Sequence, residues 1–285
     1  MDYGIIMFPT DYAISPDKLG VAAEERGFES VWFPEHTHIP SLRASAWPGG
    51  PDLPKEYWHT YDPFIALSFV ANATKDIKLG TGICLVIERD PITLAKEIAS
   101  LDRLSGGRFI FGVGGGWNAE EMENHGTAFK NRFSILRENI LAMKAIWQNA
   151  EAEFHGKYVE FDKILAFPKP AQVPHPPVLI GGDGKTTFDR VLEFGDGWMP
   201  IWGRTQATSQ SNSLEQKIND LKNKWTEAGR DIKDLNITLF GVPADEASVE
   251  KALVVGANRI IFATPCDDEK IVLPHLDKCA KLIQR

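Results

Sequence analysis

The chain has 285 residues, of which 43% are hydrophobic, and its formal net charge is −8. This length and composition allow a large core to form without metals or disulfides, and an acidic chain without a basic run lacks the phosphate-neutralising surface of a nucleic-acid binder. Three widely spaced cysteines (Cys84, Cys266 and Cys279) predict no disulfide framework, and no run approaches the ~20 apolar residues of a membrane span, so we expect a cytoplasmic protein that binds neither nucleic acid nor membrane.

Eight short β-branched or aromatic runs alternate with polar turns and helix-patterned stretches. The runs are 3–8, 30–33, 78–82, 108–113, 177–181, 195–200, 236–241 and 258–262. Eight such repeats in a chain of this length predict an α/β fold of the (β/α)8 barrel type, which typically needs about 250 residues. We therefore expect a single barrel domain over residues 1–285, with the chemistry at the C-terminal ends of the strands.

Three of the predicted helices begin at an N-cap candidate that is followed by proline. These starts are Ser15-Pro16, Asp62-Pro63 and Asp90-Pro91. A further helix over 133–148 carries an apolar stripe of Leu136, Ile140, Met143 and Trp147, which predicts packing on the barrel.

Two insertions interrupt the alternation. The first, after the second strand, covers 37–61 and contains Trp47 and Trp58 among prolines; it fits either a rigid surface excursion or a wall over the site. The second, before the fifth strand, covers 150–176 and reads as a small hairpin that turns at His155-Gly156.

Glycines gather at three predicted strand ends. They lie in the segments 80–82, 112–117 and 180–187. Glycine lets a backbone approach a flat ligand closely, and the last segment opens a helix whose N–H groups could hold a phosphate. The segment is not a P-loop, because the first glycine of that motif would fall at Leu179.

His36 follows the second strand and is the candidate acid, base or polarising group at this rim. With His38 it forms a His-x-His pair of the kind that binds zinc. A zinc site would need further histidine or aspartate ligands at later strand ends, and none of the other histidines falls there, so no metal is expected. A histidine satisfied by neighbouring backbone remains the plain structural alternative.

Several motifs, in this order and spacing, give the chain a family resemblance over nearly its whole length. They are the segments 22–32 leading to Glu35-His36, 79–83 with Arg89-Asp90-Pro91, 101–108, 111–121 and 195–198. The chain resembles the luciferase-like flavin-dependent oxidoreductase superfamily, and within it the F420-dependent oxidoreductases.

The resemblance implies a deazaflavin (coenzyme F420) or FMN lying across the strand ends, with His36 facing the reactive ring. It implies a cis peptide bulge after the third strand and places the cofactor on Thr81, Gly82, Ile83, Gly114, Gly115, Trp117, Gly181, Gly182 and Gly184. It also implies a homodimer, and it places Arg204 near the position where relatives have a basic residue for an anionic group. Independently of the resemblance, the crowding of aromatic residues predicts a partly apolar pocket with Trp47 and Trp58 as substrate contacts; its tryptophans are Trp47, Trp58, Trp117, Trp198 and Trp202. Trp117 occupies the position of the catalytic glutamate of sugar-phosphate dehydrogenases in the superfamily, which argues against a sugar-phosphate substrate.

These observations favour an oxidoreductase that transfers a hydride between F420 and a small organic molecule. An FMN-dependent monooxygenase that uses oxygen is the nearest alternative, and a flavin-binding protein without turnover is the second. A flavin-free aldolase or isomerase would need a lysine or a carboxylate pair at the strand ends, where the chain has mostly glycines.

Overall fold

The computed structural model describes residues 1–203 and 213–283. Eight parallel strands close into a barrel in the order β1-β10-β9-β8-β7-β4-β3-β2. The strands are β1 Asp2–Ile6, β2 Ser30–Phe33, β3 Lys78–Thr81, β4 Phe109–Val113, β7 Val178–Gly181, β8 Gly197–Met199, β9 Asn236–Val242 and β10 Arg259–Ala263. All eight predicted strands are confirmed, with small shifts at their ends, and so is the barrel.

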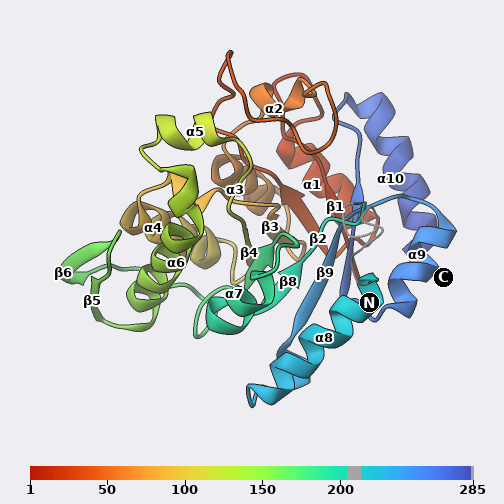
Figure 1. The fold of residues 1–285 in the computed structure, drawn as a ribbon. Helices are drawn as coiled ribbons and strands as arrows, with labels where there is room; N and C mark the ends of the chain where they lie inside the picture. The colour runs from red at the N-terminus through yellow and green to blue at the C-terminus, as the bar shows by residue number, and fades with distance from the viewer. Residues whose placement is uncertain (204–212, 284–285) are drawn as a thin grey trace.

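The helices lie around the strands, as Figure 1 shows. They are α1 Pro16–Glu25, α2 Glu56–His59, α3 Pro63–Ala73, α4 Pro91–Leu104, α5 Ala119–Asn124, α6 Arg132–Gln148, α7 Thr187–Phe194, α8 Leu214–Glu227, α9 Glu246–Val254 and α10 Glu269–Ile283. Three short 3-10 turns join them: η1 Val86–Glu88, η2 Phe129–Asn131 and η3 Ile232–Asp234. Within the described ranges, no helix has both the length and the apolar character needed to cross a bilayer.

The predicted helix starts are correct, but only two of the three N-cap side chains form a capping hydrogen bond. The Asp62 side chain accepts hydrogen bonds from the N–H groups of Phe64 and Ile65, and that of Asp90 accepts one from Thr93. Ser15 occupies the N-cap of α1, yet its side chain caps no helix N–H, so Pro16 and the extended backbone of Ser15 mark this start.

The core has two parts. Inside the barrel, side chains from six strands form an inner cluster of Ile6, Trp32, Ile110, Leu179, Met199 and Ile261. A larger cluster fills the space between strands and helices, and it contains the whole predicted α6 stripe of Leu136, Ile140, Met143 and Trp147. Packed layers of this kind close the barrel as a core and leave the loops at the strand ends to form a site.

The two insertions take different forms. The predicted hairpin is confirmed as the antiparallel pair β5 Glu151–His155 and β6 Glu160–Leu165, which stands outside the barrel next to α6 (Figure 1). The segment between β2 and α3 contains only the short helix α2, and a bridge from Thr60 to Thr10 joins it to the end of β1. This segment, residues 37–61, is called the β2–α3 loop below.

Candidate active site

His36 lies just beyond β2, at the end of the barrel where the strands finish, which is called the barrel mouth below. The neighbouring Glu35 is buried, and its carboxylate accepts hydrogen bonds from the N–H of Leu85 at 2.6 Å and from Nε of Arg89 at 2.6 Å. These bonds join the end of β2 to the segment that follows β3. The backbone around His36 is therefore held from both sides.

His36 is paired with a carboxylate from a distant part of the chain. Its Nδ1 lies 2.7 Å from Oε2 of Glu121, and the two side chains are 7% and 1% exposed. Because a carboxylate only accepts hydrogen bonds, this contact places the hydrogen on Nδ1 and leaves Nε2 for the mouth. Glu121 belongs to α5, which begins after the β4 glycine run at the N-cap residue Asn118.

Aromatic rings enclose this pair. The ring of Tyr57 lies 5.1 Å from that of His36 and 6.3 Å from that of Trp117, and Trp117 lies 5.9 Å from His36. Trp47 packs edge-on against Tyr57 at 5.6 Å. The β2–α3 loop therefore contributes an apolar wall beside the imidazole.

The same loop is fastened to α5. One carboxylate oxygen of Glu120 accepts hydrogen bonds from the N–H groups of Ala44 and Ser45, at 2.6 and 3.2 Å. Hydrogen bonds from the Ser45 side chain and from these backbone groups lower the pKa of Glu120 to about 2. Consecutive residues of α5 thus hold the catalytic candidate His36 and the wall beside it.

A cis peptide bond joins Gly82 and Ile83, directly after β3. The resemblance placed an unusual peptide at this position. Thr81 is buried, and its hydroxyl donates to the carbonyl of Gly112 at 2.8 Å, which joins β3 to β4 at the same level.

The glycines of the mouth fall into two kinds. A Cβ on Gly114 would lie 3.0 Å from the side chain of Ile83, and one on Gly115 would lie 2.5 Å from Phe133. Glycine is needed at these two positions because neighbouring side chains of the protein already fill the space that a Cβ would take. Gly182 and Gly184 differ: a Cβ there would meet nothing closer than the Thr187 hydroxyl, at 4.0 and 3.8 Å. Their backbone is therefore open to a ligand at the start of α7.

Two arginines meet beside that open turn. The guanidinium groups of Arg132 and Arg190 lie 4.4 and 4.1 Å from the ring centre of Phe133, and the Arg190 fork donates to the hydroxyls of Thr186 and Thr187. Within the described residues, neither arginine pairs with a carboxylate, and Nε of each is buried without a partner. Burial lowers the pKa of both groups; at Arg190 the charge of Asp189 opposes this fall and the charge of Arg132 adds to it. Two guanidinium groups with buried Nε donors that have no partner could bind an anion.

The remaining predicted contacts lie apart from His36 or outside the description. Trp58 is 50% exposed, and its described ring contact is with His59. Trp198, counted in the sequence among the aromatic residues of an apolar pocket, is fully buried and donates to the carbonyl of Gly182, so it supports the turn from below. Arg204 lies outside the described residues.

Sequence reasoning did not single out Glu121, Arg132 or Arg190, whereas Tyr57 lies in the 37–61 insertion that was weighed as a wall over the site. Glu121 had a misleading local signal, because a glutamate at the third position after an N-cap asparagine resembles a capping residue. The arginines begin or lie within ordinary amphipathic helices, where a basic residue usually faces solvent. These three side chains come together at the mouth only because α5, α6 and α7 all approach it in the folded structure.

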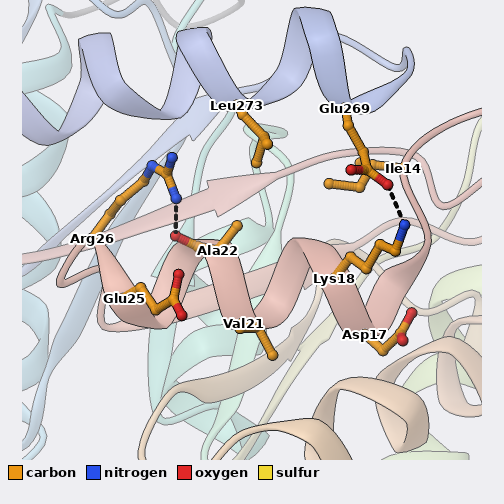
Figure 2. A pocket seen from close by; sticks show the side chains of 9 residues that line it. All are labelled: Ile14, Asp17, Lys18, Val21, Ala22, Glu25, Arg26, Glu269 and Leu273. Atoms are coloured by element: carbon orange, nitrogen blue, oxygen red, sulfur yellow. Dashed lines mark hydrogen bonds and ion pairs between the residues drawn. The ribbon is translucent and has the colours of Figure 1, made fainter.

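Two surface cavities lie outside the mouth. One, of about 370 Å³, lies between α1 and α10, where Lys18 pairs with Glu269 and Arg26 donates to the carbonyl of Ala22 (Figure 2). The other, of about 470 Å³, lies between η1, α6 and the β5–β6 hairpin. Neither is lined by a residue predicted for the site.

Comparison with known proteins shows the family of the chain. The model of the luciferase-like monooxygenase family matches residues 17–263. An uncharacterized protein of Mycobacterium tuberculosis is 38% identical over 93% of this chain and 92% of its own length. An F420-dependent hydroxymycolic acid dehydrogenase of the same organism is 29% identical, over 62% of this chain and 46% of its own length. An FMNH2-dependent dimethylsulfone monooxygenase of Pseudomonas putida is 29% identical, over 61% and 47%.

Solved structures show the same fold. A monooxygenase of Streptomyces bottropensis superposes with a TM-score of 0.76 at 17% identity, over 100% of this chain and 99% of the other. A coenzyme F420 dependent tetrahydromethanopterin reductase of Methanopyrus kandleri superposes with a TM-score of 0.74 at 18% identity, over 100% and 97%.

Proposed function

The chain belongs to the luciferase-like monooxygenase family, and from this premise we propose that it is an oxidoreductase that transfers a hydride between coenzyme F420 and a small organic substrate. The observation that carries the proposal is the buried His36–Glu121 pair at the mouth, beside the cis peptide after β3. Such a pair can give or take one proton at a fixed point.

The residues present fit a phosphate-bearing ring cofactor. The open backbone at Gly182 and Gly184 would hold the anionic tail together with Arg132 and Arg190, which form no ion pair within the described residues and whose Nε atoms have no partner. Ile83, Gly114 and Trp117 would line the ring, together with the other glycines of the mouth. When bound, the cofactor supplies the hydride or takes it up, and the protein supplies position and charge.

The role of His36 follows from its surroundings. Glu121 holds Nδ1, so Nε2 is the atom that can donate a proton to a substrate oxygen or remove one from it. The aromatic wall of Tyr57, Trp117 and Trp47 excludes water from one side and would accept a partly apolar substrate. We propose the exposed Trp58 as a further substrate contact at the outer edge of that region, whereas Arg204, the other predicted contact, lies outside the described residues.

Two other functions share the same site. FMN used with oxygen would make the protein a monooxygenase, as the name of the Pseudomonas relative indicates for that protein. A flavin-binding protein without turnover would need the ring site but not His36. We favour F420 because the motifs of the sequence resemble the F420-dependent group of the family. The F420-dependent dehydrogenase of Mycobacterium tuberculosis and the FMNH2-dependent monooxygenase of Pseudomonas putida match the chain equally, at 29% identity over 62% and 61% of it, so the choice rests on the motifs.

Binding of F420 and FMN to the purified protein, followed by fluorescence quenching, tests the choice of cofactor. We expect tighter binding of F420, and tighter binding of FMN would favour the monooxygenase.

His36→Ala tests the acid or base role. We expect turnover to fall by roughly 10²-fold while cofactor affinity changes little, because the imidazole moves a proton and does not hold the tail. Unchanged turnover would support a bystander histidine, and a ring that binds without any turnover in the parent protein would support the flavin-binding alternative.

A further inference from the structure

The second residue of α6 carries an aromatic ring that touches both the glycines of the mouth and the arginine pair. This residue, Phe133, is 38% exposed. A Cβ on Gly115 would lie 2.5 Å from its ring, so the ring packs directly on the backbone that follows β4. The position of the ring is therefore set by the glycine run at the end of that strand.

Two cations lie over this ring. The central carbon of the Arg132 guanidinium is 4.4 Å from the ring centre of Phe133, and that of Arg190 is 4.1 Å from it. A cation within about 6 Å of a ring centre is attracted by the negative charge of the ring face. Two guanidinium groups this close to one ring also repel each other through their charges. The ring thus offsets part of the repulsion between the two arginines.

Hydrogen bonds fix the outer nitrogens of both guanidinium groups. Nη1 of Arg132 donates to the carbonyl of Phe129 at 2.9 Å, and the guanidinium also lies 3.7 Å from the ring centre of Phe129. Nη1 and Nη2 of Arg190 donate to the hydroxyls of Thr186 and Thr187, at 2.7 and 3.0 Å. In the part of the chain that the structure describes, neither guanidinium forms an ion pair with a carboxylate, and Nε of each has no acceptor. Each arginine is therefore held in place while its charge is left for a ligand.

We propose that Phe133 is a positioning residue for the anion site: its ring holds the guanidinium groups of Arg132 and Arg190 together beside the start of α7 before the phosphate of the cofactor binds. Without the ring, two like charges would separate into water, and bringing them back would weaken binding of the anion. The inference rests on the proposed function, because it takes the anion to be the phosphate of F420 or FMN.

Packing alone is the competing explanation, in which Phe133 only fills the space above Gly115. The two explanations differ in what depends on the phosphate. A packing residue would affect ligands with and without a phosphate alike. A residue that positions two cations should affect only the ligand that carries the anion.

Phe133→Leu keeps an apolar side chain and removes the ring. We expect the dissociation constant of F420 to rise at least about five-fold, the effect of two weak cation–π contacts, while that of the same deazaflavin without its phosphate stays within about two-fold of the parent. FMN and riboflavin, which differ only in the phosphate, form a second pair. Fluorescence quenching measures all four constants. Equal losses for the two members of a pair would overturn the proposal.

Phe133→Tyr is the conservative variant, because it keeps the ring face, and it should bind F420 as the parent does. Phe167→Leu is the matched control: this ring follows β6, is 57% exposed and has the ammonium group of Lys169 4.5 Å from its centre. The control should leave all four constants unchanged. A Phe133→Tyr variant that binds F420 as weakly as Phe133→Leu would contradict the role of the ring.

A double-mutant cycle tests whether Phe133 acts through the arginines. When Arg132→Met and Arg190→Met are already present, Phe133→Leu should cause no further loss of F420 binding, because a positioning residue acts only through the groups that it positions. A further loss as large as the one in the parent would overturn the proposal.

Inorganic phosphate separates this inference from the function on which it rests. Phosphate should shift the Nε NMR signals of Arg132 and Arg190 in the ligand-free parent and in Phe133→Tyr, and it should bind at least about five-fold more weakly to Phe133→Leu. If phosphate behaves in this way while neither F420 nor FMN binds, the proposed function fails and the inference stands. If F420 binds and is turned over while Phe133→Leu binds F420 and phosphate as the parent does, the function stands and the inference fails.

Discussion

The most consequential residue contact is the one between His36 and Glu121. An imidazole whose Nδ1 is held by a buried carboxylate has one orientation and one free nitrogen, Nε2, at which a proton can be accepted and later returned. The carboxylate also stabilises the positive charge that develops when the ring is protonated. On the proposed function, Glu121 would therefore contribute to the chemistry through His36, without touching the substrate.

Glu121→Gln should lower turnover about 10-fold and leave the dissociation constant of the cofactor within about two-fold of the parent. The amide fills the same space but carries no charge, and it can present its NH2 to Nδ1, which would favour the wrong tautomer. Steady-state rates and a fluorescence titration on the same preparation measure the two effects. Glu123→Gln controls for a changed α5, and a rate equal to that of the parent would contradict the assigned role.

Glu88, the last residue of η1, predicts a pH dependence of stability, because its side chain is only 1% exposed. Its pKa is raised from 4.5 to about 9, so between these values the folded protein holds a proton that the unfolded chain has released. The free energy of unfolding should therefore decrease as pH rises through this window, by at most about 1.4 kcal/mol per pH unit.

Glu88→Gln should remove that slope. Urea unfolding of the parent and the variant from pH 5 to pH 9 should show a stability difference that grows in favour of the variant as pH rises. Below about pH 4.5 the difference should be constant, because the group is protonated in both states. A difference that is flat from pH 5 to pH 9 would show that Glu88 titrates normally.

At the scale of elements, local signals were predictable and long-range pairings were not. The strands and the proline-marked helix starts follow from residues within one turn or one run, so the sequence located them closely. The contact of His36 with Glu121 spans 85 positions and depends on where α5 enters the mouth. No periodicity encodes such a distance.

The glycine segments illustrate the same limit. All three were expected to admit a ligand, and only coordinates separate glycines filled by Ile83 and Phe133 from those at 182 and 184, which face open space. A glycine in a sequence states that a side chain is absent. It does not state whether protein or ligand takes the space.

The junction of α6 with α7 yields a prediction about the cofactor tail. Replacing Arg132 or Arg190 by methionine should weaken F420 binding at least about 10-fold, the loss of one charge-assisted contact, and should leave binding of the same ring system without its phosphate nearly unchanged. Arg137→Met is the control, since Arg137 also lies on α6 but pairs with Glu193 at 2.5 Å. Equal losses for both ligands would mean that the arginines shape the ring site instead.

At the scale of the whole molecule, a group of apolar side chains on and before α3 is exposed to solvent. Helix α3 is apolar on most sides, and Ile65 and Phe69, one turn apart, are 62% and 59% exposed. Trp58 and Tyr61, just before the helix, are 50% and 44% exposed. These four residues are called the α3 patch. A helix that is apolar all round is normally buried, and exposed patches of this kind mark interfaces.

We expect the α3 patch to pair with the same patch of a second copy, which gives the homodimer that the family resemblance implies. A two-fold axis would place Phe69 against its own symmetry mate or near it, so Phe69→Glu would bring two charges into an apolar contact and should raise the dimer dissociation constant at least about 100-fold. Sedimentation equilibrium measures this. Leu104→Glu changes another exposed apolar residue, 85% exposed at the end of α4, and should leave the dimer intact. If Phe69→Glu and the parent protein sediment alike, the two copies meet elsewhere or do not associate. Cofactor binding should be the same in the variant and the parent, because α3 lies outside the mouth.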